Sequence, residues 1–174
     1  MIVMNPHEST FEAHFEVKQI IEGWALGTFF IEIDGIWIGN RLDDSVDLKG
    51  GIRWWRDLVS NPKDRYEPGL YDESKERVFS LLAASVLVHE DKSGLLTEHY
   101  VDTFSRFHIS QIGMSSFDDV TMLFLKNERG LERLVWKVGE GSVCEAYFSE
   151  GKIESVLSES IDSLERAINR FVMA

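Results

Sequence analysis

An Asp34-Gly35 pair between two apolar runs constrains the fold of this chain more than any other sequence feature. The first run covers residues 26–33, and Ile36, Trp37 and Ile38 follow the pair. Asp-Gly in this position is the strongest short signal for a β-hairpin, because both residues tolerate the left-handed backbone of a two-residue turn. The segment therefore predicts two adjacent antiparallel strands.

A further strand is predicted before this hairpin, because apolar and polar residues alternate between Phe11 and Lys18. Alternation with period two is typical of a strand that has one buried face and one solvent-facing face. The N-terminal part therefore predicts a three-stranded antiparallel meander. Residues 40–51 are polar and contain glycine, and they predict a loop.

Helical segments are predicted after this meander. Residues 52–59 form a short helix that Asn61-Pro62 ends. A second helix runs from an N-cap at Asp72 to about Val88, with Val78, Leu81, Leu82 and Ser85 facing the core. The last helix is indicated by apolar residues that recur every three or four positions: Val156, Leu157, Ile161, Leu164, Ile168, Phe171 and Val172.

Four more strands are expected over residues 103–112, 120–126, 131–138 and 142–148. Val120–Leu125 is apolar on both faces, as in a central strand that helices cover. The expected fold class is α+β, with a single antiparallel sheet of mixed strand lengths, about six to seven strands, and about two to three helices packed on it. A boundary near Asp91–Thr97 is conceivable, but we expect one domain over residues 1–174.

The charge of the chain restricts its partners. It has 30 acidic and 18 basic residues, a net charge of -12. Such a surface repels nucleic acid and anionic lipid, so we expect neither as a partner. It suits a basic protein partner, because opposite fields steer encounter, although acidity also serves solubility alone.

The compartment is predicted from features of the sequence as a whole. Cys144 is the only cysteine, so no internal disulfide is possible, which favours a reducing compartment. No secretory signal and no membrane-spanning apolar run is recognised. We therefore expect a cytoplasmic protein.

No catalytic, metal or cofactor motif is recognised in the sequence. His89-Glu90 begins like a zinc-protease helix but lacks the second histidine. The histidines have no metal-ligand spacing, and those of two predicted strands, His14 and His108, are expected on solvent-facing sides; the full set is His7, His14, His89, His99 and His108. We therefore expect no catalytic residue, no metal and no cofactor, and a binding protein in place of an enzyme.

The order of these features resembles a family of bacterial immunity proteins. These are antitoxins of polymorphic toxin systems, including contact-dependent growth inhibition loci. The resemblance rests on "NPHESTFEAHFEV" before an aromatic strand, Trp24-Ala25-Leu26-Gly27 before "TFFIEIDGIWIG", and "FDDVTMLFLKNERGLERLVWKV" before a final helix. The resemblance covers most of the chain in the order and the residue composition of its segments, and its motifs have low specificity.

The resemblance implies a small α+β immunity domain without enzyme activity. Such a protein binds the C-terminal domain of one cognate toxin in the cytoplasm and blocks it by stoichiometric occlusion. Toxins of this kind are often basic nucleases, which the acidity of this chain would suit. The family has no shared catalytic residues to carry over, and whether the chain is a monomer or a homodimer stays open.

Two acidic clusters and several tryptophans are the candidate toxin contacts. The alternative for the carboxylates is an ordinary solvated surface, and for the tryptophans it is core packing. The candidates are Asp43, Asp44, Asp47, Glu154, Glu159, Asp162, Trp37, Trp54 and Trp55.

Other functions remain open from the sequence. One alternative is a small-ligand or enzymatic domain with an anion pocket formed by His108, Arg106 and Arg133 on adjacent strands. Another is a subunit of a homomeric assembly, in which the aromatic residues would serve an interface.

Overall fold

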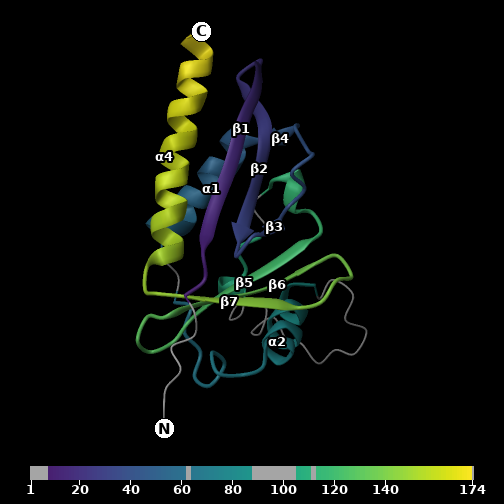
Figure 1. Cartoon of the computed structure of the whole chain (residues 1–174), viewed down its shortest axis with the longest axis vertical. Coiled ribbons are helices and arrows are strands. Elements are labelled where there is room, and N and C mark those ends of the chain that lie inside the picture. Colours follow the sequence, from purple (N-terminus) through teal and green to yellow (C-terminus); the bar gives the residue numbers. More distant parts are fainter. Residues whose placement is uncertain (1–7, 62–63, 88–104, 111–112, 174) are drawn as a thin grey trace.

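The computed structural model describes residues 8–61, 64–87, 105–110 and 113–173 (Figure 1). It confirms the α+β class, but the seven strands within these ranges form two sheets, and the prediction of a single sheet is wrong. The first sheet holds β1 (Phe11–Ile21), β2 (Trp24–Ile33), β3 (Ile36–Ile38) and β4 (Val46–Asp47); the second holds β5 (Val120–Lys126), β6 (Glu132–Val138) and β7 (Cys144–Phe148). We call them sheet A and sheet B.

The predicted meander is confirmed in sheet A. Strands β1, β2 and β3 pair antiparallel in that order, and β4 pairs with β2. Asp34 and Gly35 both have positive φ, 50° and 79°, as the two-residue turn requires. Glu22 and Gly23 form a similar turn between β1 and β2, with φ of 49° and 88°. Strand β4 lies inside the segment predicted as a loop.

Sheet A has an inner and an outer face. Its inner face carries Phe29, Ile31 and Ile33, which are at most 3% exposed. Helices α1 (Leu48–Ser60) and α4 (Lys152–Met173) pack on this face, since Phe29 lines one small cavity together with Trp55 of α1, Leu157 of α4 and four other residues. In Figure 1, α4 runs along β1, and α1 lies behind the sheet.

Sheet B is buried on both faces because it contributes to two cores. Phe124, Leu134 and Ala146 join the main core with sheet A and α4. Leu123, Leu125 and Val135 point the other way and pack with Val78 and Leu82 of α2 (Lys75–Leu87). The prediction that β5 is apolar on both faces is therefore confirmed, but the central strand of this sheet is β6.

The strand predicted over residues 103–112 is wrong within its described part. Ser105–Phe107 is a short 3₁₀ helix, and His108 makes an isolated antiparallel bridge to Leu123. The sheets are therefore not joined by a strand at this place. A backbone hydrogen bond from Ser9 N to Tyr147 O, at 3.0 Å, links the segment just before β1 with β7.

The predicted helices are present, with shifted starts. Helix α1 begins at Leu48, four residues before the predicted start, because Asp47 caps it by accepting a bond from Lys49 N at 3.1 Å. Helix α2 is capped by Ser74 and not by Asp72, since the Ser74 hydroxyl accepts from Arg77 N at 3.3 Å. In α2, Val78 and Leu82 are buried, but Leu81 is 36% exposed.

Helix α4 follows its predicted period and then extends past the core. Ile153, Leu157, Ile161, Leu164 and Ile168 are buried on one side. The last turn leaves its apolar side chains in solvent, and they are Phe171, Val172 and Met173. Within the described ranges, no helix has both the length and the hydropathy that crossing a membrane would require.

Several features named from the sequence lie outside the described residues. They include the conceivable boundary near Asp91–Thr97, the His89-Glu90 pair, the predicted helix end at Val88, and the histidines His7 and His99.

Candidate functional site

The outer face of sheet A presents half-buried and exposed side chains from three strands. In the ladder, Glu12 lies opposite Glu32, His14 opposite Phe30, and Glu32 opposite Trp37. Paired residues share a face of a sheet, so these side chains all point away from α1 and α4. We define the outer face by Glu12, His14, Glu16, Thr28, Phe30, Glu32 and Trp37, none of which is fully buried.

Aromatic rings form a row across this face. The rings of His14 and Phe30 are stacked, with centroids 4.9 Å apart and planes 16° apart. Phe30 lies 6.2 Å from Trp37, and the Arg41 guanidinium lies 3.2 Å above the Trp37 ring. Trp37 is 47% exposed. Exposed tryptophan and arginine beside one another are typical of binding hot spots in protein interfaces.

Carboxylates surround this aromatic row. Glu12 and Glu16 are exposed on β1, and Glu32 is half-buried on β2. Lys18 pairs with Glu16 at 2.7 Å. Because the two partners are largely exposed, this pair does not hold either side chain strongly, and both are available to a protein partner.

The tip of the β1–β2 hairpin carries two more exposed apolar side chains. Ile21 and Trp24 face one another in the last pair before the turn and are 48% and 56% exposed. The tip and the exposed end of α4 lie at the same end of the molecule in Figure 1. Large apolar side chains gathered on a surface indicate a site of interaction.

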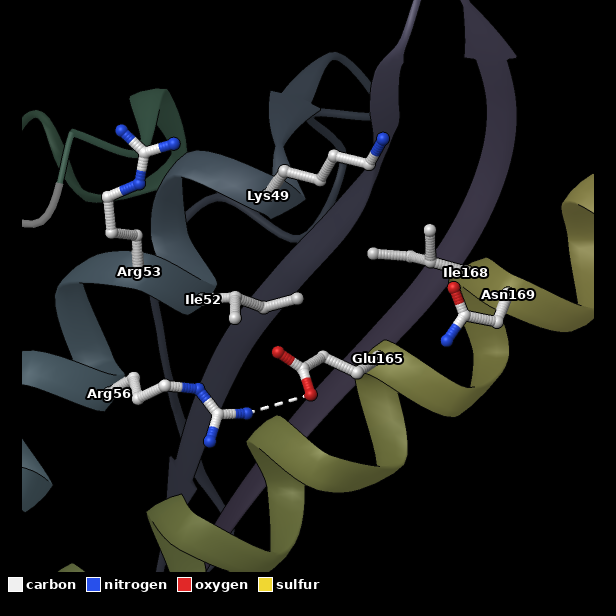
Figure 2. A pocket seen from close by; sticks show the side chains of 7 residues that line it. All are labelled: Lys49, Ile52, Arg53, Arg56, Glu165, Ile168 and Asn169. Carbon is white, nitrogen blue, oxygen red and sulfur yellow. Dashed lines mark ion pairs between the residues drawn. The ribbon is translucent and has the colours of Figure 1, made fainter.

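A second feature is an open groove of about 530 Å³ between α1 and α4. Figure 2 shows Lys49, Arg53 and Arg56 along α1, facing Glu165 and Asn169 of α4, with Ile52 and Ile168 between them. Arg56 pairs with Glu165 at 2.8 Å, and Lys49 Nζ donates to the Gly23 carbonyl at 2.5 Å. Two of the three cations are therefore used within the protein.

The comparison with protein families decides the identity. The family model described as Immunity protein 42 matches residues 5–163.

The chain belongs to the Immunity protein 42 family.

As a member of this family, the immunity protein acts as an antitoxin. Its protein partner is a toxin, and its function is not enzymatic. Among curated proteins, none matches this chain. Among solved structures, it is similar to the crystal structure of CdiI from Burkholderia dolosa AUO158, with a TM-score of 0.68 and 12% identity over 88% of this chain and 95% of that chain. At that identity the likeness shows the fold.

The first predicted acidic cluster of the immunity protein is partly used to hold its own loop. Asp43 accepts bonds from the Ser115 hydroxyl and from the Ser45 hydroxyl and backbone N–H. The Ser115 hydroxyl, followed by that of Ser45, lowers the pKa of the Asp43 carboxyl below its usual value. Asp47 caps α1, whereas Asp44 is exposed.

The second predicted cluster lies on α4. Glu154 pairs with Lys126 at 2.9 Å, and Asp162 lies 3.6 Å from the Arg56 guanidinium. Glu159 is exposed and accepts from Ser155 of the same helix at 3.4 Å. The two clusters lie at opposite edges of sheet A, because α4 runs along β1 whereas the Asp43–Asp47 loop lies beyond β2 (Figure 1).

The three predicted tryptophans are in three different environments. Trp37 is on the outer face of sheet A. Trp54 is 37% exposed on α1, with its ring 6.4 Å from that of Trp55. Trp55 is 1% exposed and packs 6.2 Å from Phe29, so it belongs to the core and presents no surface to a partner.

The predicted anion pocket is not supported, because its three side chains are directed at other protein groups. The His108 Nε2 lies 3.0 Å from the Leu82 carbonyl, so this histidine is covered by α2 and the prediction of a solvent-facing position is wrong. Arg106 pairs with Glu67 at 2.8 Å. Arg133 is 1% exposed and pairs with Glu145 at 2.5 Å.

Most of the outer face of sheet A was not predicted from the sequence. Glu12, His14 and Glu16 stood out only as the polar half of an alternation, and Phe30 as part of an apolar run. The signal that could have found it is the alternation of side chains between the two faces of a strand. Because Asp34-Gly35 fixes the register of the hairpin, this alternation puts Glu32, Phe30 and Trp37 on the same face.

Proposed function

We propose that this immunity protein neutralises its toxin by binding it one to one through the outer face of sheet A and occluding the toxin's functional surface. The observation that carries the proposal is the row of His14, Phe30 and Trp37 across that face, bordered by carboxylates. An aromatic centre with a charged rim is the usual anatomy of a specific protein interface.

The toxin is proposed to be a basic nuclease domain at the C-terminus of a larger toxin. A net charge of -12 supports this choice, because an acidic immunity protein is attracted to a surface built to bind phosphate. Glu12, Glu16 and Glu32 border the aromatic row, and Asp44 is exposed on the loop after β3. These carboxylates would meet basic side chains of the toxin.

The biological setting is proposed to be a contact-dependent growth inhibition or related polymorphic toxin system. The family match and the fold shared with a protein named CdiI support this setting. We place the encounter in the cytoplasm. We also treat residues 1–174 as one immunity domain. The main core supports this, because it joins residues of both sheets, α1 and α4, from Phe11 to Ile168.

The proposal is tested by co-expression with the toxic C-terminal domain encoded beside this gene. The wild-type protein is expected to rescue growth and to co-purify with that domain at a fixed ratio. Failure of a well-folded wild-type protein to rescue or to bind would overturn the immunity assignment for that toxin.

Matched charge reversals identify the face. Glu16→Lys changes the outer face of sheet A, and Glu159→Lys makes the same change at an exposed position of α4. We expect Glu16→Lys to weaken co-purification strongly and Glu159→Lys to leave it intact. If Glu159→Lys loses co-purification and the change on the outer face does not, the toxin contacts α4. If neither variant loses co-purification, the outer face is not the toxin contact.

A further inference from the structure

Three potential metal ligands meet on the outer face of sheet A. Glu12 and Glu32 are direct partners in the β1–β2 ladder, and His14 is two residues along β1 on the same face. One donor atom from each of these side chains lies within 4.8 Å of the other two. The sequence does not show this group, because Glu32 joins the other two only when the hairpin forms.

The distances within the group resemble those between ligands of one ion. The His14 Nε2 lies 3.1 Å from Glu32 Oε2 and 3.5 Å from Glu12 Oε2. Zinc bonds of about 2.0–2.1 Å to nitrogen and oxygen put neighbouring ligands of a tetrahedral site roughly 3.4 Å apart. The two separations, 3.1 and 3.5 Å, lie on either side of that value.

The imidazole nitrogen is shielded from solvent and has no hydrogen-bond partner of adequate geometry, although both carboxylates are near. The His14 Nε2 lies 3.1 Å from Glu32 Oε2, but the two atoms form no aligned hydrogen bond, so this nitrogen is left unsatisfied by the carboxylate beside it. A cation lying between the nitrogen and the oxygens would satisfy all three groups.

The backbone and a neighbouring ring hold the group in place. All three residues lie on paired strands, which position side chains better than loops do. The His14 ring is stacked on Phe30 with planes 16° apart, and this contact restricts rotation of the imidazole. The imidazole would therefore lose little conformational freedom on binding an ion, whereas the Glu12 side chain, which is 63% exposed, would become ordered.

We propose that Glu12, His14 and Glu32 bind a divalent transition metal, with Zn²⁺ as the best match. Calcium and magnesium prefer oxygen ligands alone, whereas one imidazole with carboxylates suits zinc. Two carboxylates balance the charge of the ion. Three protein ligands leave one position for water on the solvent side. Zinc binding by the isolated protein does not rest on the proposed toxin contact.

Calorimetric titration of the full chain with Zn²⁺ alone tests the site. We expect one ion per chain and much weaker binding of Mg²⁺ and Ca²⁺. His14→Ala is expected to weaken Zn²⁺ by at least the roughly 10-fold loss that even indirect supports of a metal site produce. Glu16→Gln, on the same strand and face but outside the group, is the control and should bind like the wild type.

A second readout separates this site from zinc held elsewhere. The His14 ring resonances in NMR should shift on addition of one equivalent of Zn²⁺. If His14→Ala does not fold, the double variant Glu12→Gln with Glu32→Gln replaces it in the titration. This variant keeps the size of both side chains and is also expected to weaken Zn²⁺ binding. Absence of binding, or binding that neither variant weakens, would overturn the site while leaving the toxin proposal standing.

Discussion

The carboxylate of Glu132, at the start of β6, accepts a hydrogen bond of 2.8 Å from the backbone N–H of Ile153 in the first turn of α4. It also accepts from Gly151 N at 3.0 Å, and Lys126 Nζ lies 3.3 Å away. Glu132 is fully buried, and burial raises the pKa of its carboxyl. A residue of sheet B therefore caps the helix that covers sheet A, where the helix dipole favours a negative charge.

Replacement of Glu132 by alanine is expected to lower the free energy of unfolding by about 3 kcal/mol, because the change leaves two buried backbone N–H groups without an acceptor, while Lys126 keeps its pair with Glu154. Urea unfolding at pH 7 measures this. Glu140→Ala removes an exposed carboxylate that lies 3.7 Å from Lys137 and should have little effect. Equal stability of the two variants would show that the cap is unimportant.

Acid should weaken the fold through His108. Burial against α2 lowers the pKa of this imidazole from 6.5, so the folded state favours the neutral ring. As the pH falls, the imidazole is protonated in the unfolded chain before it is protonated in the folded state. The stability that the neutral, buried ring contributes above pH 6.5 is therefore lost as the pH falls from about 6.5 through the lowered pKa. Urea unfolding at several pH values between 7.5 and 5 should show a larger loss for the wild type than for His108→Gln. Parallel curves would contradict this prediction.

Gly27 is expected to tolerate no side chain. A Cβ there would overlap the backbone carbonyl oxygen of Glu16 on β1 and would lie 2.9 Å from Leu48 Cδ1. Gly27→Ala should therefore lower the free energy of unfolding by about 1–3 kcal/mol, as overpacking does. Thr28→Ala, at the next position and on the outer face, is the control in thermal unfolding. A Gly27→Ala melting temperature unchanged from the wild type would refute the close approach.

The ion pair between Arg56 and Glu165 should contribute little, although it spans the groove in Figure 2. Both side chains are nearly half exposed, at 47% and 45%. Exposed pairs give about 0.2–1 kcal/mol, and salt screens them. A double-mutant cycle of Arg56→Ala and Glu165→Ala in urea should give a coupling in that range. A coupling well above it that persists in high salt would mean that the pair holds α1 against α4.

Toxin affinity should depend on Trp37. Because the Trp37 ring lies in the centre of the proposed contact, Trp37→Ala is expected to weaken the free energy of toxin binding by about 2 kcal/mol, which is roughly a 30-fold rise in Kd. Trp54→Ala, which removes a similarly exposed ring from α1, is the matched control. Binding measured from low to high salt should weaken as charges are screened. If Trp54→Ala has the larger effect, the toxin contacts the helical side.

Local rules explain what was predictable in this chain. Asp34-Gly35 specifies a turn of its own, the alternation from Phe11 specifies a strand with two unlike faces, and the three-and-four spacing of Leu157, Ile161 and Leu164 specifies a helix with one buried side. Each of these patterns is determined by backbone geometry within a few residues. The α+β class follows from them.

Only the tertiary structure decided how these elements combine. The sequence predicts a strand at His108, but α2 covers this residue, and the strands of the described residues form two sheets in place of one. Glu132 is buried because the start of α4 supplies its donors, and Glu12, His14 and Glu32 meet because two strands pair in one register. These contacts join residues distant in sequence, so their energy depends on packing and burial, which no local pattern contains.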